Sequence, residues 1–466
     1  MRRTPTRSAR RAPGPVGVTG TMVAGLACAT LPSFLIGALQ GRITAEFGIG
    51  AGEIGLAVAL FFVAGGVTSI PAGRIVDRIG SPAALRIGMG LAAASSLLIA
   101  ALVTNAWQLT AALAIAGPAM ALVDTAGSRA MSRAVPHHRQ GVAFGTKEAS
   151  PPIASLVAGL TLPLIAVQFG WRPAFVGAAV VATLTGLMIS SRLESGEGPG
   201  EADDTPAPVD PDPHPAAGDD EAGDDEAADA PAVPRGSADA TPTHADVRPE
   251  AADDRPDPGT DAPSTTPLLI LLAASAATAG AVGSSVSTFL VPTAEVAGMT
   301  AGTAGVVLSV ASLAAACMRV ISGATVDRLV GSELLGVAVL TGAGSLGVAG
   351  LAFAGGPFAD SPAAHTLLIA SAVLALGGGW ASSGLLFLSG IRIEPARPAL
   401  SGGVVLSGLA LGGSLGRVGY GFAADHLGFA FSWGLATPLM ASAAVVALVL
   451  RHRIRAHDAA SVGDHG

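Results

Sequence analysis

Four ionisable side chains lie inside long apolar runs of this sequence, where a charge needs a partner or a function. Asp124 lies in one run, Lys147 and Glu148 lie in the next, and Arg417 lies near the end of the chain. A turn near Pro136 puts Asp124 12 residues before it and Lys147 11 residues after it, and these positions are level in an antiparallel hairpin. We therefore predict an Asp124–Lys147 ion pair, with either a structural role or a role in binding substrate or a proton.

Glu148 follows Lys147 directly and points roughly 100° away from it on a helix. A desolvated carboxylate can hold a proton near neutral pH, which makes Glu148 a candidate for proton coupling. The alternative is an ion pair between Glu148 and Arg129 or Arg133, which lie near the end of the preceding apolar run.

Arg417 has no acidic neighbour on its own predicted helix before Asp425. An unpaired guanidinium attracts anions, and Lys147 would supply a second positive group, so these two residues predict a site for a carboxylate or another anion. The alternative is that Arg417 reaches outward toward Asp425 or the lipid interface.

Two features of the backbone accompany these charges. Pro151 and Pro152 should interrupt a helical hydrogen-bond ladder and kink the helix near a moving region, although prolines are also ordinary in membrane helices. The run that contains Arg417 is rich in glycine, which indicates close helix packing or, alternatively, a hinge.

Apolar runs must position all of these residues. Half of the chain is hydrophobic and 13% is charged, which is too apolar for a soluble core with a polar surface. We predict an all-α membrane protein with twelve transmembrane helices in two pseudo-symmetric six-helix bundles. The expected spans are 16–38, 52–72, 83–104, 108–130, 141–168, 172–191, 267–291, 301–322, 333–354, 364–390, 399–422 and 428–450.

The predicted domains follow from these spans. They are an N-terminal tail at 1–15, a six-helix bundle at 16–192, an acidic Pro/Ala-rich linker at 193–266, a second bundle at 267–450 and a C-terminal tail at 451–466. The linker holds 21 of the 34 acidic residues and is expected to be disordered. Arginines gather at one end of the spans, so both tails and the linker are predicted to be cytoplasmic, in a multi-pass protein of the inner cell membrane.

Several classes of protein are disfavoured. The basic residues form no aromatic-bearing face, which argues against nucleic-acid binding. There is no P-loop for ATP, and the histidines lack metal-ligand spacing, so we expect no enzyme, cofactor or metal site. Cys28 and Cys317 lie in apolar runs and are read as packing residues.

The two predicted halves share a motif. Gly73, Asp77, Arg78 and Gly80 follow the second span, and Gly323, Asp327 and Arg328 follow the eighth at an offset of 250 residues. The motif resembles the Gly-x-x-x-Asp-Arg-x-Gly loop of the major facilitator superfamily. The resemblance implies that this loop latches the halves and controls a conformational switch. The chain departs from that pattern at Ser81 and Pro82, where the family usually has a basic pair, and Gly331 shows that the second copy has an extra residue.

The resemblance implies a secondary transporter that works by alternating access. We expect a proton-coupled symporter of a small solute, with an organic anion as the first candidate, which acts as a monomer in contact with lipid. An efflux pump for drugs or hydrophobic compounds is the first alternative. A membrane sensor or scaffold without transport, and a membrane enzyme, are alternatives of a different class.

Overall fold

The computed structural model describes residues 15–136, 143, 145–193, 265–326, 332–356, 362–395 and 397–463, and these ranges contain helices and no strand. Both predicted halves belong to one compact unit. The predicted N-terminal tail before Pro15, and the linker apart from a few residues at its two ends, lie outside the described residues. Asp327 and Arg328 of the second motif copy also lie outside them.

The helices of the N-terminal half follow the predicted spans, because apolar residues surround each helix and polar or glycine residues end it. For example, Asn105 begins α5 by accepting a hydrogen bond from the backbone N–H of Gln108 at 3.0 Å. The elements are α1 (Pro15–Ala38), α2 (Gln40–Phe47), α3 (Ala51–Ile79), α4 (Ser81–Leu102), α5 (Ala106–Ala134), α7 (Ser150–Thr161), the π-helical η1 (Leu162–Ala166), α8 (Val167–Phe169) and α9 (Arg172–Leu193).

The C-terminal half repeats this arrangement and ends with a longer helix than predicted. Helix α16 continues past residue 450 because no proline or glycine follows Pro438 until Gly463. The elements are α10 (Thr266–Val296), α11 (Ala301–Val326), α12 (Glu333–Ala354), α13 (Pro362–Leu374), the π-helical η2 (Ala375–Gly379), the 3-10 turn η3 (Trp380–Ser382), α14 (Ser383–Ile393), α15 (Pro398–Leu427) and α16 (Phe429–Gly463).

Eleven helical segments in the described part of the chain are long and apolar enough to cross a membrane. They match eleven of the twelve predicted spans. The remaining predicted span, 399–422, corresponds to α15, which is 30 residues long but is not among the eleven. Its glycines, serines and Arg417 lower its hydropathy, although its length is sufficient for a tilted span.

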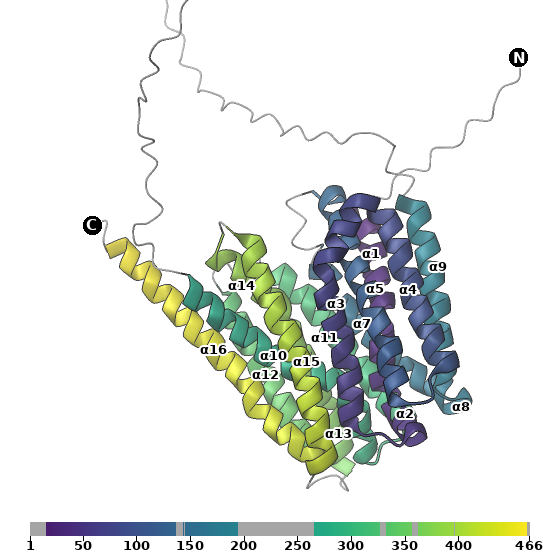
Figure 1. Ribbon diagram of the computed structural model, residues 1–466. Helices are drawn as coiled ribbons and strands as arrows, with labels where there is room; N and C mark the ends of the chain where they lie inside the picture. The colour runs from purple at the N-terminus through teal and green to yellow at the C-terminus, as the bar shows by residue number, and fades with distance from the viewer. Residues whose placement is uncertain are drawn as a thin grey trace, which may run out of the picture. The chain divides into compact units, whose positions relative to one another are not determined.

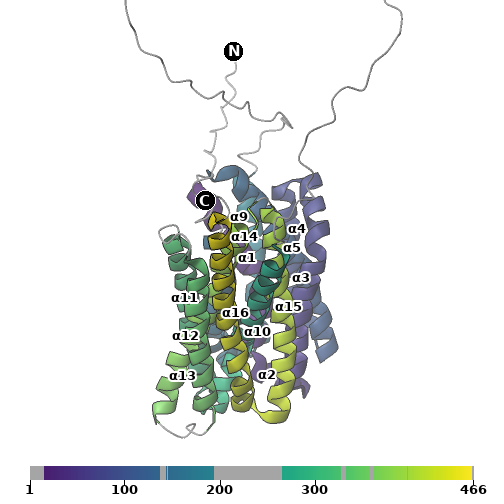
Figure 2. The same cartoon turned by 90° about the vertical axis from the view of Figure 1, so that its left-hand side faces the viewer.

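Two ends of the helical unit are distinguished below. At the linker end, α9 ends at Leu193 and α10 begins at Thr266; at the loop end, α15 turns into α16 at Gly428. Figure 1 shows the helices of the two halves diverging toward the linker end, and Figure 2 shows the C-terminal helices in front of the N-terminal ones.

The buried apolar residues divide in the same way. One cluster joins both halves and includes Leu35 and Phe61 with Phe289 and Tyr420. Toward the linker end each half has a separate cluster, one around Leu85 and the other around residues such as Val405. The core is therefore shared at the loop end and divided at the linker end.

Within the C-terminal half, α10 and α15 pack closely through a stripe of small residues. A Cβ atom on Gly408, Gly412 or Gly416 would lie 2.0–2.7 Å from a backbone oxygen of α10, at Ala273, Ala277 and Ala281 respectively. The spacing of four residues on both helices is that of a small-xxx-small contact. At these positions the glycines of α15 serve packing.

Candidate functional site

The predicted pair of Asp124 and Lys147 is present between α5 and the segment that precedes α7. Lys147 Nζ lies 2.7 Å from Asp124 Oδ1 and donates a second hydrogen bond to Ser128 Oγ at 3.0 Å. Lys147 is buried, whereas 44% of the Asp124 side chain is exposed. The hairpin arithmetic placed these two residues level because both helices leave the same turn and rise equally per residue.

The helix is interrupted directly after Lys147, just before Pro151 and Pro152. Glu148 and Ala149 form a turn, and α7 begins at Ser150. In a regular helix the N–H groups of residues 151 and 152 would bond the carbonyl oxygens of Lys147 and Glu148, but proline has no N–H. Ser150 Oγ bonds the first of these oxygens at 2.5 Å. The interruption turns adjacent side chains toward different helices.

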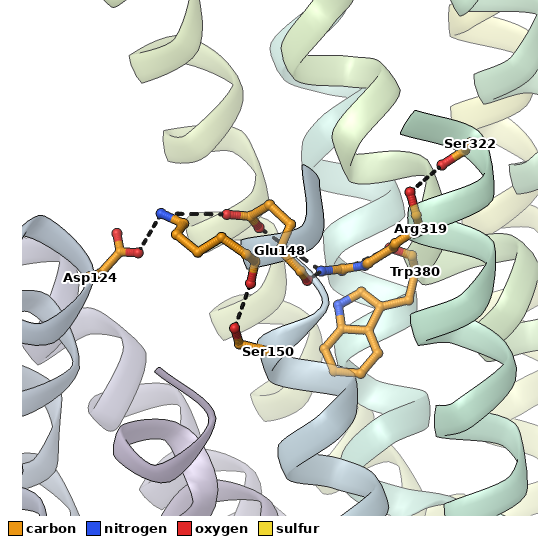
Figure 3. A network of polar contacts seen from close by, with 7 residues as sticks. Asp124, Glu148, Ser150, Arg319, Ser322 and Trp380 are labelled. Atoms are coloured by element: carbon orange, nitrogen blue, oxygen red, sulfur yellow. Dashed lines mark hydrogen bonds and ion pairs between the residues drawn. The ribbon is translucent and has the colours of Figure 1, made fainter. Parts of the chain in front are cut away.

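The second oxygen is bonded by a residue from the other half. Arg319 of α11 donates from Nη1 to the backbone oxygen of Glu148, and the same nitrogen lies 3.9 Å from Glu148 Oε2. Its Nη2 and Nε donate to the backbone oxygen of Trp380 at 2.9 and 3.3 Å. Figure 3 shows the resulting line of groups from Asp124 across Glu148 to Arg319 and Trp380.

Glu148 therefore lies between two cations. Its Oε1 is 3.9 Å from Lys147 Nζ, and its Oε2 is 3.9 Å from Arg319 Nη1. The predicted partners Arg129 and Arg133 are not the ones observed, because the turn at Glu148 directs the side chain toward α11. Arg319 falls inside the predicted span 301–322, and that position could have identified it as a fifth ionisable residue within an apolar run.

Arg417 lies buried where α3, α10 and α15 meet. Its Nε donates to Thr288 Oγ1 and its Nη1 to the backbone oxygen of Gly413, both at 3.1 Å. The guanidinium carbon lies 4.3 Å from the centre of the Phe62 ring. Among the described residues it forms no ion pair with a carboxylate, and it does not reach Asp425. The outward orientation considered for Arg417 is therefore not the one observed.

Asp425 instead joins the two halves at the loop end. Its Oδ1 and Oδ2 accept hydrogen bonds from the backbone N–H groups of Ala51 and Gly52, at 2.7 and 2.8 Å. These are the first residues of α3, so the carboxylate of α15 caps that helix and faces its positive end. Sequence reasoning missed this contact because Asp425 stands at the end of a helix, where a solvated carboxylate is common.

The glycine-containing motif lies at the linker end and makes its observed ion pair within one half. Asp77 at the end of α3 pairs with Arg129 of α5, while Arg78 is exposed. Gly80 connects α3 to α4 with φ of 80°, a conformation that favours glycine. Gly73, Asp77 and Arg129 line an open surface groove of about 670 Å³. Of the second copy, only Gly323 lies on a described helix, α11.

At the loop end, the Gly170-Trp171-Arg172 segment holds Glu46 of α2. Trp171 Nε1 and Arg172 Nη1 each donate to a Glu46 oxygen at 2.6 Å. The hydrogen bond from Trp171, and then the one from Arg172, lower the pKa of Glu46 below its usual value. This contact ties α2 to α9 within the N-terminal half.

The described residues contain no group of three or more His, Cys, Asp or Glu side chains that could hold a metal ion. The polar groups near the middle of the unit are instead two acidic and two basic side chains in a line, Asp124, Lys147, Glu148 and Arg319. The guanidinium of Arg417 lies apart from them. Such groups can bind and release an ion or a charged solute as helices move.

Comparisons with known proteins agree with this architecture. The chain is 28% identical over 194 residues to the uncharacterized MFS-type transporter Rv1250 of Mycobacterium tuberculosis (strain ATCC 25618 / H37Rv). That match covers 40% of this chain and spans only 33% of the length of the relative.

Solved structures of a bacterial homologue of the human lysosomal transporter Spinster share the fold. The inward-facing, unoccupied form aligns with a TM-score of 0.60 at 13% identity, over 96% of each chain. The inward-facing, occupied form aligns with a TM-score of 0.59 at 12% identity, over 93% of this chain and 95% of that one.

The sequence profile of the Major Facilitator Superfamily matches residues 21–389, which include nearly all of the first half and most of the second. The all-helical fold with two similar halves is the fold of that family. This chain therefore belongs to the major facilitator superfamily of membrane transporters.

Proposed function

We propose that this protein is a proton-coupled transporter of a small organic anion. The observation that supports this best is Arg417, a buried guanidinium whose observed hydrogen bonds go to neutral groups. A buried charge without a counter-charge is costly, and an anion arriving beside it would remove that cost. Thr288 and the Phe62 ring add a hydroxyl and an apolar surface beside the guanidinium.

The position of Arg417 suits a solute that enters from one end. On α15, Tyr420 belongs to the core shared by both halves, whereas Val405, nearer the linker end, belongs to the separate core of the C-terminal half. Arg417 thus lies close to the level at which the shared core ends. A solute approaching between the halves from the linker end would meet it there, as alternating access requires.

The line of charges supports coupling to protons. Lys147 is paired with Asp124 and lies 3.9 Å from Glu148, so its charge is balanced in this conformation. A proton on Asp124 or Glu148 would leave a net positive charge here, which an arriving anion could balance. Protonation of Glu148 would remove an attraction shared by Lys147 and Arg319. We propose Glu148 as the proton carrier, Asp124 as the partner that holds Lys147, and Lys147 as a second cation that joins Arg417 when released.

The proposed orientation places the linker end in the cytoplasm of the cell, because arginines gather in the short connections at that end. The protein would then be a multi-pass, monomeric protein of the inner cell membrane. Its motif residues Gly73, Asp77, Arg78 and Gly80 would control switching from the cytoplasmic side.

A second candidate function is export of hydrophobic compounds. A groove of about 660 Å³ lies between α10 and α15 and is lined mainly by apolar residues, including Ala273, Val404 and Leu411. An apolar compound could bind in such a groove without a charged partner.

Flux measurements in proteoliposomes separate the two functions. Labelled carboxylates and cationic dyes would be tested in both directions, with and without an imposed pH gradient. We expect carboxylate flux that depends on the gradient in the wild type and is lost in Arg417→Gln. Arg453→Gln, which changes an exposed arginine near the end of α16, is the matched control and should leave flux unchanged. Undiminished carboxylate flux in Arg417→Gln would contradict the role of Arg417, and dye flux alone would favour the second function.

A further inference from the structure

We infer that Arg319 is a positioning residue that docks onto the Glu148 backbone carbonyl left free by Pro152, and thereby holds the halves together along α7 and α11. The inference rests on the transport function but not on the identity of the substrate. Arg319 belongs to the C-terminal half and the carbonyl belongs to the N-terminal half.

The docking point follows from the covalent structure of proline. Position 152 would supply the N–H that bonds the carbonyl of residue 148 in an α-helix, and proline cannot supply it. A carbonyl inside a membrane protein needs another donor, because no lipid group can provide one. The buried guanidinium of Arg319 provides that donor.

The other donors of Arg319 fix its direction. Two of its nitrogens bond the backbone oxygen of Trp380, and the guanidinium carbon lies 5.2 Å from the centre of the Trp380 ring. The guanidinium is therefore bound to Trp380 in the C-terminal half, and it extends from there to Glu148 in the N-terminal half (Figure 3). A guanidinium held at three points by backbone oxygens has little freedom to follow a different partner.

The contact completes a series of contacts between α7 and α11. Ser309 Oγ bonds the backbone oxygen of Leu156 at 3.0 Å, and Ser312 Oγ bonds Ser155 Oγ at 2.9 Å. The Arg319–Glu148 contact continues this antiparallel series toward the linker end. Arg319 thus prevents α7 and α11 from separating there, so opening at the linker end must occur elsewhere between the halves.

Backbone docking makes a prediction that differs from that of a side-chain ion pair. The Glu148 carboxylate lies 3.9 Å from Arg319 Nη1, beyond hydrogen-bond distance, whereas the backbone oxygen accepts a hydrogen bond. Glu148→Gln keeps the backbone oxygen and should keep the contact. Pro152→Ala restores the N–H that competes for this oxygen, and should weaken the contact as Arg319→Gln does.

The test measures the distance between the halves by spin labels on exposed residues Arg133 and Thr325, in full-length protein with Cys28 and Cys317 replaced by alanine. We expect one narrow distance distribution for the wild type, Glu148→Gln and Pro151→Ala. Pro151→Ala is the matched control. The N–H that it restores would bond the Lys147 carbonyl, which already accepts a hydrogen bond from Ser150 Oγ. Pro152→Ala and Arg319→Gln should broaden the distribution, and the double variant should broaden it no further.

Two results would overturn the inference: an unchanged distribution in Pro152→Ala, or a Glu148→Gln distribution as broad as that of Arg319→Gln. If Arg319→Gln does not fold, Pro152→Ala still decides the question, and Arg319→Lys should restore part of the contact. Because the distance measurement needs no substrate, a failure of anion transport with the expected distances counts against the proposed function alone.

Discussion

The two halves of the molecule meet along two pairs of helices that are held in different ways. Helices α7 and α11 are joined at intervals along their length, from the close approach of Gly159 and Gly305, through Ser155 and Ser312, to Arg319 at the carbonyl of Glu148. Helices α3 and α15 are joined at the loop end, where Asp425 caps α3. Farther along α3, Val67 and Ile70 are each 72% exposed.

This difference indicates which pair of helices can separate more easily. The α3–α15 contact depends on the first turns of one helix and the last turns of the other, so it can hold the loop end while the linker end opens. The α7–α11 contact continues toward the linker end and resists such opening. We therefore expect the α3–α15 side to open and the α7–α11 side to act as a pivot, and four changes test that comparison.

The largest effect is expected where the α3–α15 contact depends on a glycine. A Cβ on Gly55 would lie 2.4 Å from the backbone oxygen of Arg417, so Gly55→Leu should force α3 and α15 apart and destabilise the protein by about 3 kcal/mol. Thermal unfolding in detergent measures the loss. Gly66→Ala is the control, because a Cβ there meets nothing within 4 Å. Equal melting temperatures for Gly55→Leu and the wild type would show that the two helices are not tightly held.

A smaller effect is expected at the Asp124–Lys147 ion pair, which holds the segment before α7 against α5 in the N-terminal half. Asp124→Asn removes the charge beside the buried Lys147 ammonium and should destabilise the protein by about 2 kcal/mol, with Ser128 as the remaining close partner on α5. The double variant Asp124→Asn with Lys147→Met should recover much of that loss, because it leaves no buried charge unpaired. Additive losses in the double variant would contradict the pair. Chemical unfolding of the three variants supplies the comparison.

Loss of the Asp425 cap should affect the loop end selectively. Asp425→Asn keeps one carbonyl acceptor but loses the charge and one of two bonds to α3, a loss of about 1 kcal/mol. The loop end should then open more often, and a cysteine introduced at Thr44, which lines the groove beside Asp425, should react faster with a water-soluble reagent in protein with Cys28 and Cys317 replaced by alanine. His426→Gln, which changes the exposed neighbour of Asp425 on α15, is the control. No difference in reaction rate between the two variants would mean that Asp425 does not hold this end.

The smallest effect concerns a contact within one half, which should leave both pairs of helices unchanged. The lowered pKa of Glu46 means that its ionised form is stabilised in the folded protein. This stabilisation, roughly 0.5 kcal/mol, should be present above the unfolded pKa near 4.3 and should be lost as the pH falls through the lower folded value. Unfolding measured from pH 6 to pH 3 should show this loss in the wild type and not in Glu46→Gln.

The spacing of residues about the turn near Pro136 correctly predicted one ion pair. The Asp124–Lys147 pair could be anticipated because a single turn joins two helices with equal rise per residue. The partners of Glu148 could not, since they depend on a turn that Pro151 and Pro152 impose and on a helix 171 residues away in the chain. Arg417 was expected to be unpaired from its own helix, but its neighbours Phe62 and Thr288 come from two others.

The class of fold follows from the amino-acid sequence alone, because long apolar runs must become helices in a membrane and the repeated Gly, Asp and Arg positions mark two related halves. The sequence also determined where the helix ladder breaks, since proline lacks an N–H whatever surrounds it. Three features depend instead on how the helices pack: the group that bonds the freed carbonyl, the helix that Asp425 caps, and the level at which the shared core divides. Those features depend on contacts between residues far apart in the chain, which local spacing does not encode.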